Sequence, residues 1–500
     1  MKIFILYETY NIEFFGKYIL GKYLVSKFDK NVEVQVGFYR DLMLQIYKCK
    51  PNEKVIIIGN QIYKNNQVLI DYFNFKNFVF FGQHEEEHSL FSVNIENYFK
   101  LLISRHYFNK FQKYLCFNNK TKKVLKNILK IENNMLYPVG NAKYDFLSIL
   151  KNHADFSKKL VKQEKFILIT LPDSFFKTVS IYREYLKNNK KISITHSNDQ
   201  IIGNRSLSEA ISTYFYMKQF LKSVMILSKI NKKDKIIIKP HPSDYEFLSK
   251  LKSAFKNFQN VKIETKHEIY HLIMNSKFVI SSPSSPIIDS ALMGKKVICF
   301  YNKKNRFHRF VFSKHPSIKF KNVKFVSHLN FKSLENIILN CKVPKILPSM
   351  LPPKKFHYEN IYNQVKKVKF GKIKKNIFLD KLIFKKVIKK IEEQKKKREY
   401  GLGGAKKFNS KFKISFERAL AVLYFWDNPF RLDFLNILRK FVLGRSFTNV
   451  DLKDWHGGYN QKINIKTLIL FEKYFKKELD FFNKSNFKVK NKKVIILKKN

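Results

Sequence analysis

The stretch that decides the fold has three parts: residues 236–244, IIIKPHPSD; residues 278–286, FVISSPSSP; and residues 297–300, VICF. The first two parts begin with a short apolar run, and the third is such a run throughout, as is typical of buried strands. Asp289 and Gly294 lie between the second part and the third. The carboxyl ends of parallel strands meet at one edge of a sheet, where ligands of open α/β sheets bind. A basic segment and a hydroxyl cluster at such an edge, beside a helix start, predict a site for a phosphate.

The first of these segments positions a basic residue and a histidine. Pro240 and Pro242 restrict the backbone around His241 and keep it extended at the strand end. His241 can then donate to a phosphate oxygen, and Lys239 adds a compact positive charge. The alternative is a loop histidine with an ordinary role in a turn.

The second segment carries four serines between a strand and a helix expected to start near Ile287. Ser284 and Ser285 are the expected N-cap and phosphate ligands, although serine and proline also dominate plain polar loops. Asp289 follows in the first turn of the helix. Its carboxylate either holds a ribose hydroxyl or only interacts favourably with the helix N-terminus.

Apolar runs alternate with amphipathic stretches along the first two thirds of the chain, which predicts βαβ units and parallel sheets. Strands are expected at residues 3–7, 32–36, 55–58, 78–81, 136–139 and 166–170, and helices at 15–27, 93–104 and 206–230. The predicted fold is α/β, with two Rossmann-like domains at residues 1–160 and 161–345. A basic linker with an amphipathic helix (346–405) and a mostly helical extension (406–500) are expected to follow.

Polar clusters also follow strands of the first half. Glu85, Glu86 and Glu87 lie side by side in a basic chain, so each raises the pKa of the others, which suits a general base or a carboxylate nucleophile. A solvated acidic turn is the alternative.

Two further clusters are expected on the rim of the cleft between the halves. Glu8, Asn11 and Glu13 follow the first strand. After Gly140, which suits a turn with positive φ, Asn141 and Lys143 either face the cleft or belong to a structural turn.

The formal net charge is +58, from 97 Lys and Arg against 39 Asp and Glu. Such a field attracts phosphate-rich partners, although lysine also fills solvated faces by default. The Lys-rich stretch Asn376–Arg398 has an apolar helical face, which either lies on an anionic membrane or packs back on its own domain.

Several classes of protein are disfavoured by what the sequence lacks. The four cysteines are far apart, so neither a zinc site nor a disulfide framework is expected, and a reducing compartment fits. No apolar run is long enough to cross a membrane. P-loop, nucleophile-elbow, zincin and D-x-D motifs are missing, and neither a metal nor a cofactor is expected.

Together these residues resemble the bacterial surface-carbohydrate biosynthesis proteins, a GT-B-like group related to sialyltransferases and capsule Kdo transferases. The resemblance covers roughly residues 1–305. It rests on Glu8 to Glu13, Glu85-Glu86-Glu87, the segment 140–145, His241-Pro242, Ser284-Ser285, Asp289 and Gly294.

The resemblance implies a metal-independent glycosyltransferase that moves Kdo, sialic acid or another nonulosonic acid from a CMP-sugar to a surface glycan or glycolipid. It implies that His241, Ser284 and Ser285 bind the donor phosphate and that Glu86 or Glu87 serves the chemistry. The expected location is the cytoplasm, with peripheral contact to the inner membrane left open. The alternatives are an enzyme acting on CDP-glycerol or a UDP-sugar and a basic nucleic-acid-binding protein, for which no specific recognition pattern is found.

Overall fold

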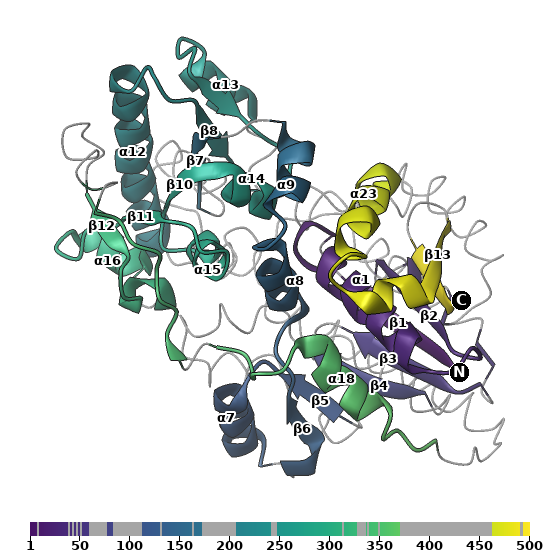
Figure 1. Cartoon of the computed structure of the whole chain (residues 1–500). Coiled ribbons are helices and arrows are strands. Elements are labelled where there is room, and N and C mark those ends of the chain that lie inside the picture. Colours follow the sequence, from purple (N-terminus) through teal and green to yellow (C-terminus); the bar gives the residue numbers. More distant parts are fainter. Residues whose placement is uncertain are drawn as a thin grey trace, which may run out of the picture.

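The computed structural model describes residues 1–7, 10–38, 41–42, 45–46, 49–50, 53–59, 78–83, 113–130, 133–162, 165–172, 207–241, 248–312, 315–327, 337, 340–348, 351–370, 463–490 and 494–500. These residues form two α/β units, each built on its own sheet (Figure 1). The predicted α/β class with two Rossmann-like domains is therefore confirmed.

The first sheet has eight strands among the described residues, in the order β13-β14-β2-β1-β3-β4-β5-β6. The strands β1 to β6 pair in parallel and are apolar along most of their length, as expected of strands covered on both faces. Their bounds are β1 Lys2–Tyr7, β2 Glu33–Phe38, β3 Val55–Gly59, β4 Val79–Gln83, β5 Lys113–Cys116 and β6 Leu136–Pro138. The strands predicted for this half are confirmed.

Helices cover this sheet and lead into the second unit. The described ones are α1 Tyr10–Lys27, α7 Asn119–Leu129, the 3₁₀ turn η2 Asn133–Met135, α8 Ala142–Leu150 and α9 Ala154–Val161. α1 and α8 approach closely at Gly16, where an added Cβ would lie 2.2 Å from the carbonyl oxygen of Ala142. The helix predicted at residues 93–104 lies outside the described residues.

The second sheet has six parallel strands in the described part of the chain, in the order β12-β11-β10-β7-β8-β9. Their bounds are β7 Phe166–Thr170, β8 Ile236–Lys239, β9 Val261–Ile263, β10 Ser276–Ser281, β11 Val297–Phe300 and β12 Lys324–Val326. The three strands of the stretch that decides the fold are therefore β8, β10 and β11.

The connections of this sheet are helical. They include α12 Leu207–Ile230, α13 Leu248–Phe255, α14 Ile269–Asn275, α15 Ser285–Leu292, α16 Arg306–Phe312 and the 3₁₀ turn η4 Pro316–Lys319. The long helix predicted at 206–230 is confirmed. α15 begins two residues before the expected Ile287, because Ser284 takes the N-cap position and Pro286 fits the first turn of a helix.

After the second sheet the chain returns to the first unit. The helix α18, His357–Val365, packs against α1 and α8 and lies beside the first sheet in Figure 1. The Gln83 Nε2 atom lies 3.1 Å from His357 Nε2, and Lys113 Nζ donates to Gln364 Oε1 over 3.2 Å.

The last residues of the chain contain a hairpin that was not predicted. The described residues 463–490 and 494–500 form α23 Ile465–Phe475, the 3₁₀ turn η6 Asp480–Lys484, and the strands β13 Ser485–Lys490 and β14 Val494–Lys499. Residues 406–462 of the predicted, mostly helical extension lie outside the described residues. β14 pairs antiparallel with β2 and so extends the first sheet. Lys488 and Lys490 take exposed positions of β13 and alternate with half-buried residues, in the two-residue period of a strand. The predicted helix Asn376–Arg398 lies outside the described residues.

A buried ionic cluster fixes this C-terminal segment to α1. Glu472 of α23 accepts from the hydroxyl of Tyr18 over 2.5 Å and lies 3.2 Å from Lys22 Nζ. Lys22 also donates to the backbone oxygen of Ser485 over 2.7 Å. Charges buried in this way need such partners, so the segment is an integral part of the first unit.

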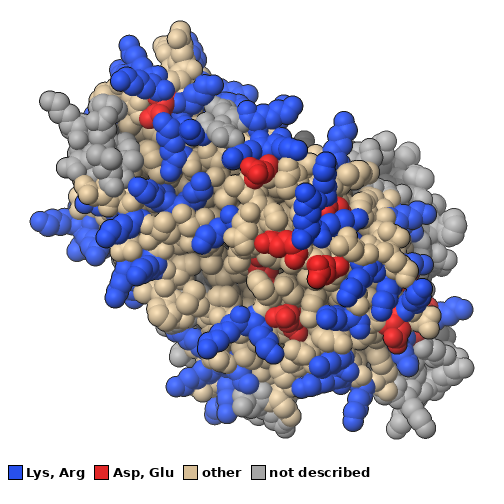
Figure 2. Space-filling view, in the orientation of Figure 1, with Lys and Arg blue, Asp and Glu red and all other residues tan. Residues whose placement is uncertain are grey.

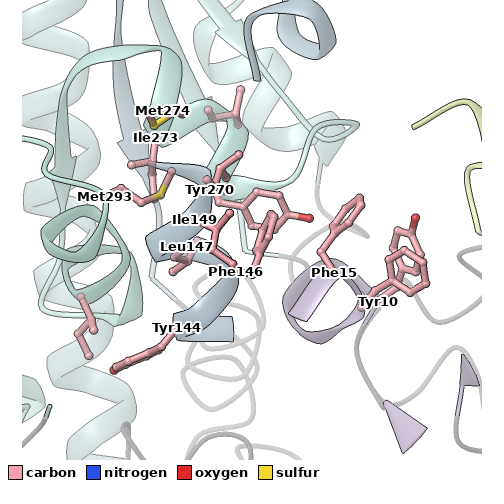
Figure 3. Packing of buried hydrophobic residues seen from close by; sticks show 14 of the residues in the cluster. Tyr10, Phe15, Tyr144, Phe146, Leu147, Ile149, Tyr270, Ile273, Met274 and Met293 are labelled. Atoms are coloured by element: carbon pink, nitrogen blue, oxygen red, sulfur yellow. The ribbon is translucent and has the colours of Figure 1, made fainter. Parts of the chain in front are cut away.

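An apolar core continues from the first unit into the second through α8 (Figure 3). Phe146 of α8 stacks on Phe15 of α1 at a centroid distance of 5.3 Å and meets Tyr270 of α14 edge-on at 4.9 Å. Aromatic contacts of this kind fix the two units against each other.

None of the helices that the structure describes combines the length and the apolar character needed to cross a membrane. Cys49, Cys116, Cys299 and Cys341 are buried thiols without disulfide bonds.

Candidate functional site

Three neighbouring strands of the second sheet end in polar side chains at the same level. Thr170 of β7 is in register with Lys239 of β8 on one side and with Ser281 of β10 on the other. The Thr170 hydroxyl donates to the Ser281 hydroxyl over 2.7 Å. The His241 segment and the serine segment therefore leave the sheet at one edge, on either side of β7 and about 10 Å apart.

The inner serines shape the loop between β10 and α15. Ser281 and Ser282 are fully buried, and the Ser281 hydroxyl also donates to the backbone oxygen of Ser282. Ser282 hydrogen-bonds to the hydroxyl of Tyr216 on α12, and Tyr216 donates to the backbone oxygen of Phe300 over 2.8 Å. These two serines are therefore committed to holding the loop in place.

The outer serines lie at the start of α15 and are partly exposed. The Ser284 hydroxyl bonds back into the loop, to the Ser282 oxygen and the Ser281 hydroxyl, both over 2.9 Å, and does not cap the helix. The Ser285 side chain makes no hydrogen bond within the described residues, and Pro286 has no N–H group. The start of α15 thus offers the Ser285 N–H and hydroxyl groups to an anion.

Lys239 and His241 differ in exposure. Lys239 is buried, and burial lowers its pKa to about 8, while the charges of Glu264 and Glu268 oppose that change. It therefore remains mostly protonated at neutral pH. His241 follows Pro240 directly and is partly exposed.

Glu264 and Glu268 lie at the same edge and were not predicted. Although burial raises the pKa of Glu264, the N–H of Lys266 and the side chains of Lys262 and His267 lower it to about 2. Burial raises the pKa of Glu268, which occupies the N-cap position of α14. The only sequence signal for them is their place between a strand end and a helix start.

This edge faces the first unit. Burial raises the pKa of Tyr10, the first residue of α1, and the charge of Glu268 adds to this effect. Glu13, one turn further along α1, is buried. The predicted Glu8, Glu86 and Glu87 lie outside the described residues, as does the side chain of Asn11.

The segment that follows β6 is a junction of three elements. Gly140 has the predicted positive φ, 89°. The Asn141 side chain accepts from the Lys143 N–H over 2.7 Å and so caps α8. The Asp145 carboxyl accepts from the N–H of Tyr358 over 3.3 Å at the start of α18, and it also accepts from the N–H of His357.

Lys143 joins this junction to the predicted phosphate edge. Its ammonium lies 2.8 Å from Oδ2 and 2.7 Å from Oδ1 of Asp289 on α15. Both side chains are buried, and burial raises the pKa of Asp289, whereas Lys143 opposes that rise. The structure thus brings two predicted site residues together as an ion pair that connects α8 with α15.

The described residues contain no group of three or more His, Cys, Asp or Glu side chains placed to hold a metal ion. Besides the carboxylates of Glu264 and Glu268, the edge carries hydroxyls, a backbone N–H, an imidazole and an ammonium. Each of these four kinds of group can donate a hydrogen bond to an anion.

No protein-family model matches the sequence, and no curated protein does. Similar solved structures include a UDP-GlcNAc 2-epimerase from Methanocaldococcus jannaschii, with a TM-score of 0.44 and 14% identity over 73% of this chain and 100% of the other. The epimerase from Neisseria meningitidis bound to UDP-GlcNAc has a TM-score of 0.43 and 14% identity, over 74% and 100% of the two chains. A single-residue variant of the wall teichoic acid polymerase TagF has a TM-score of 0.34 and 10% identity, over 78% and 90%.

Proposed function

We propose that this chain is a glycosyltransferase that moves an acidic sugar, such as Kdo, sialic acid or another nonulosonic acid, from a CMP-sugar onto a surface polysaccharide or lipid-linked glycan. The observation that carries the proposal is the edge formed by β8, β7 and β10. There the partly exposed His241 and the open start of α15 flank a row of polar strand ends that faces the first unit. The choice of CMP rests on the sequence resemblance.

In this proposal the second unit binds the departing nucleotide. The N–H and hydroxyl groups of Ser285 and the ring of His241 donate hydrogen bonds to the phosphate oxygens. Lys239 adds positive charge. In the transfer an acceptor hydroxyl oxygen bonds to the anomeric carbon while the bond from that carbon to the phosphate oxygen breaks. The bonding electrons leave with CMP. Fixed donors aimed at this developing charge typically contribute about 3 kcal/mol each to transition-state stabilisation.

The first unit would supply the acceptor side. Glu86 or Glu87 is proposed to take the proton of the acceptor hydroxyl, and Glu8, Asn11 and Glu13 are proposed to line the same side. No metal is needed in this scheme, because the helix start and the basic side chains neutralise the phosphate.

Isothermal titration of the full-length chain with CMP, CDP and UDP tests the donor site. CMP is expected to bind, and Ser285→Ala and His241→Ala are each expected to weaken binding about tenfold, the loss of one charge-assisted hydrogen bond. Ser253→Ala is the matched control, since Ser253 is exposed on α13 away from this edge.

The outcomes separate the rival functions. Tighter binding of CDP or UDP than of CMP would indicate that the donor substrate is CDP-glycerol or a UDP-sugar. Binding of nucleic acid that falls steeply with salt and survives His241→Ala, with no mononucleotide binding, would favour a nucleic-acid-binding protein.

A further inference from the structure

The outer face of α12 carries an apolar pair that the fold leaves in water. Ile226 is 41% exposed and Ile230 is 46% exposed, and they lie one helical turn apart. The opposite face of the helix is firmly packed. Its fully buried residues are Tyr216, Met217, Phe220, Val224 and Leu227. Because that face is fixed against the second sheet, α12 cannot rotate to bury the isoleucines.

A row of lysines runs beside this apolar pair. Lys218, Lys222 and Lys229 are exposed and follow one another at helical spacing, and Lys232 and Lys233 follow the helix end. In Figure 2, Lys and Arg side chains are spread over the side of the molecule where Figure 1 shows α12 and α13.

Acidic side chains do not offset this row. Between residues 212 and 235 the single acidic residue is Asp234, which accepts from Asn231 over 3.0 Å and pairs with Lys277. The face formed by Lys218, Lys222, Ile226, Lys229 and Ile230 is therefore both basic and apolar; we call it the α12 face.

We propose that the α12 face binds the surface of a bilayer that contains anionic lipid. The negative potential of such a surface attracts lysines. Exposed isoleucines lower the free energy when they leave water and enter the boundary between lipid headgroups and acyl chains. A nucleic acid would satisfy the lysines but would leave both isoleucines in water, so the combination favours a membrane.

The topology keeps this contact away from the anion site. α12 ends at Ile230, and β8 begins six residues later at Ile236, so the apolar pair lies toward the amino edge of the second sheet. His241 and Ser285 lie at the carboxyl edge. A chain seated on a membrane through the α12 face thus leaves the opposite edge open, and the proposal does not depend on the donor site.

Co-sedimentation of the full-length chain with vesicles tests the proposal. The vesicles are phosphatidylcholine alone or phosphatidylcholine mixed with phosphatidylglycerol. The mixed vesicles are expected to bind the chain and the neutral ones to bind it weakly. Ile226→Ser/Ile230→Ser and Lys222→Gln/Lys229→Gln are each expected to lower the partition coefficient about tenfold or more.

The chain offers a matched control for each variant. Ile465 and Ile469 on α23 form another exposed pair with the same spacing, so Ile465→Ser/Ile469→Ser removes equal apolar surface elsewhere. Lys123→Gln/Lys126→Gln removes two exposed lysines from α7. Both controls are expected to change partitioning less than about twofold. Glu472, which pairs with Lys476, and Glu478 lie among the lysines of α23 and of the residues that follow it, and α7 has no exposed apolar pair among its described side chains. Circular dichroism and thermal unfolding check that every variant folds.

The proposal is overturned if the control pairs lower binding as much as the α12 variants, because that result indicates non-specific attraction of a basic chain. It is also overturned if the anionic vesicles do not bind, or if single-stranded RNA binds and the isoleucine variant leaves that binding unchanged.

Discussion

The serine loop before α15 and the junction after β6 have the same sequence plan, since in both a strand ends, polar residues follow and a helix begins. In the serine loop, Ser281 and Ser282 are buried and Ser285 is left without a side-chain partner among the described residues. In the junction, Asn141, Lys143 and Asp145 are all buried and all bonded to protein.

This difference separates a candidate ligand site from a structural connection. A polar helix start remains available to an anion only where its donors are not already bonded inside the protein. The polar groups of the junction bond to α8, α15 and α18, whereas in the serine loop Ser281, Ser282 and Ser284 bond inside the loop and Ser285 does not. Substitutions in the two regions should therefore affect different measurements.

The largest effect is expected at the ion pair of the junction. Lys143→Met leaves the buried Asp289 without its cation, and such a change typically lowers the free energy of unfolding by about 3–5 kcal/mol. Urea denaturation followed by circular dichroism measures it. The double variant Lys143→Met/Asp289→Leu should recover most of the loss, because it removes both charges. A loss below about 1 kcal/mol in the single variant would contradict the pairing.

The next effect is expected where α1 meets α8. Gly16→Ala places a Cβ 2.2 Å from the backbone oxygen of Ala142, so one of the helices must shift. We expect a loss of about 3 kcal/mol of unfolding free energy, measured by thermal and urea unfolding. Lys27→Ala at the exposed end of the same helix is the control and should have almost no effect.

A contrast is expected inside the serine loop. Ser281→Ala removes the buried partner of Thr170 and should lower the free energy of unfolding by about 1–2 kcal/mol. Ser285→Ala should change it by less than about 0.5 kcal/mol while weakening nucleotide binding. Equal stability losses in the two variants would place both serines in the structural framework.

A pH-dependent change in stability is expected at Asp145. Burial raises its pKa from 3.8 to about 8, so the folded chain holds a proton that the unfolded chain has released. Through this group, stability falls as the pH rises between those two values. Asp145→Asn removes that dependence. Urea denaturation over this pH range should therefore show the free energy of unfolding of the variant increasing relative to that of the unmodified chain as the pH rises. A constant difference would show that Asp145 does not titrate in this way.

Much of the fold was predictable because long apolar runs mark the buried parallel strands, as in Val55–Gly59 and Phe166–Thr170. The hairpin of β13 and β14 was missed, although Lys488 and Lys490 alternate with half-buried residues in the two-residue period of a strand. Its pairing with β2 joins residues at opposite ends of the sequence.

The common edge of the His241 and serine segments was also predictable, from strand order alone. The partners of polar side chains were not. Lys143 and Asp289 are 146 residues apart, and no local pattern indicates that they meet. Glu268 was missed for a similar reason, because only the fold brings it near Lys239 and Tyr10.

A crystal structure of the chain soaked with CMP tests the central proposal most directly. It is expected to show the phosphate within hydrogen-bond distance of the Ser285 N–H and hydroxyl groups and of the His241 ring, with the Lys143–Asp289 pair intact beneath it. A phosphate bound elsewhere, or an edge that stays without nucleotide at saturating CMP, would contradict it.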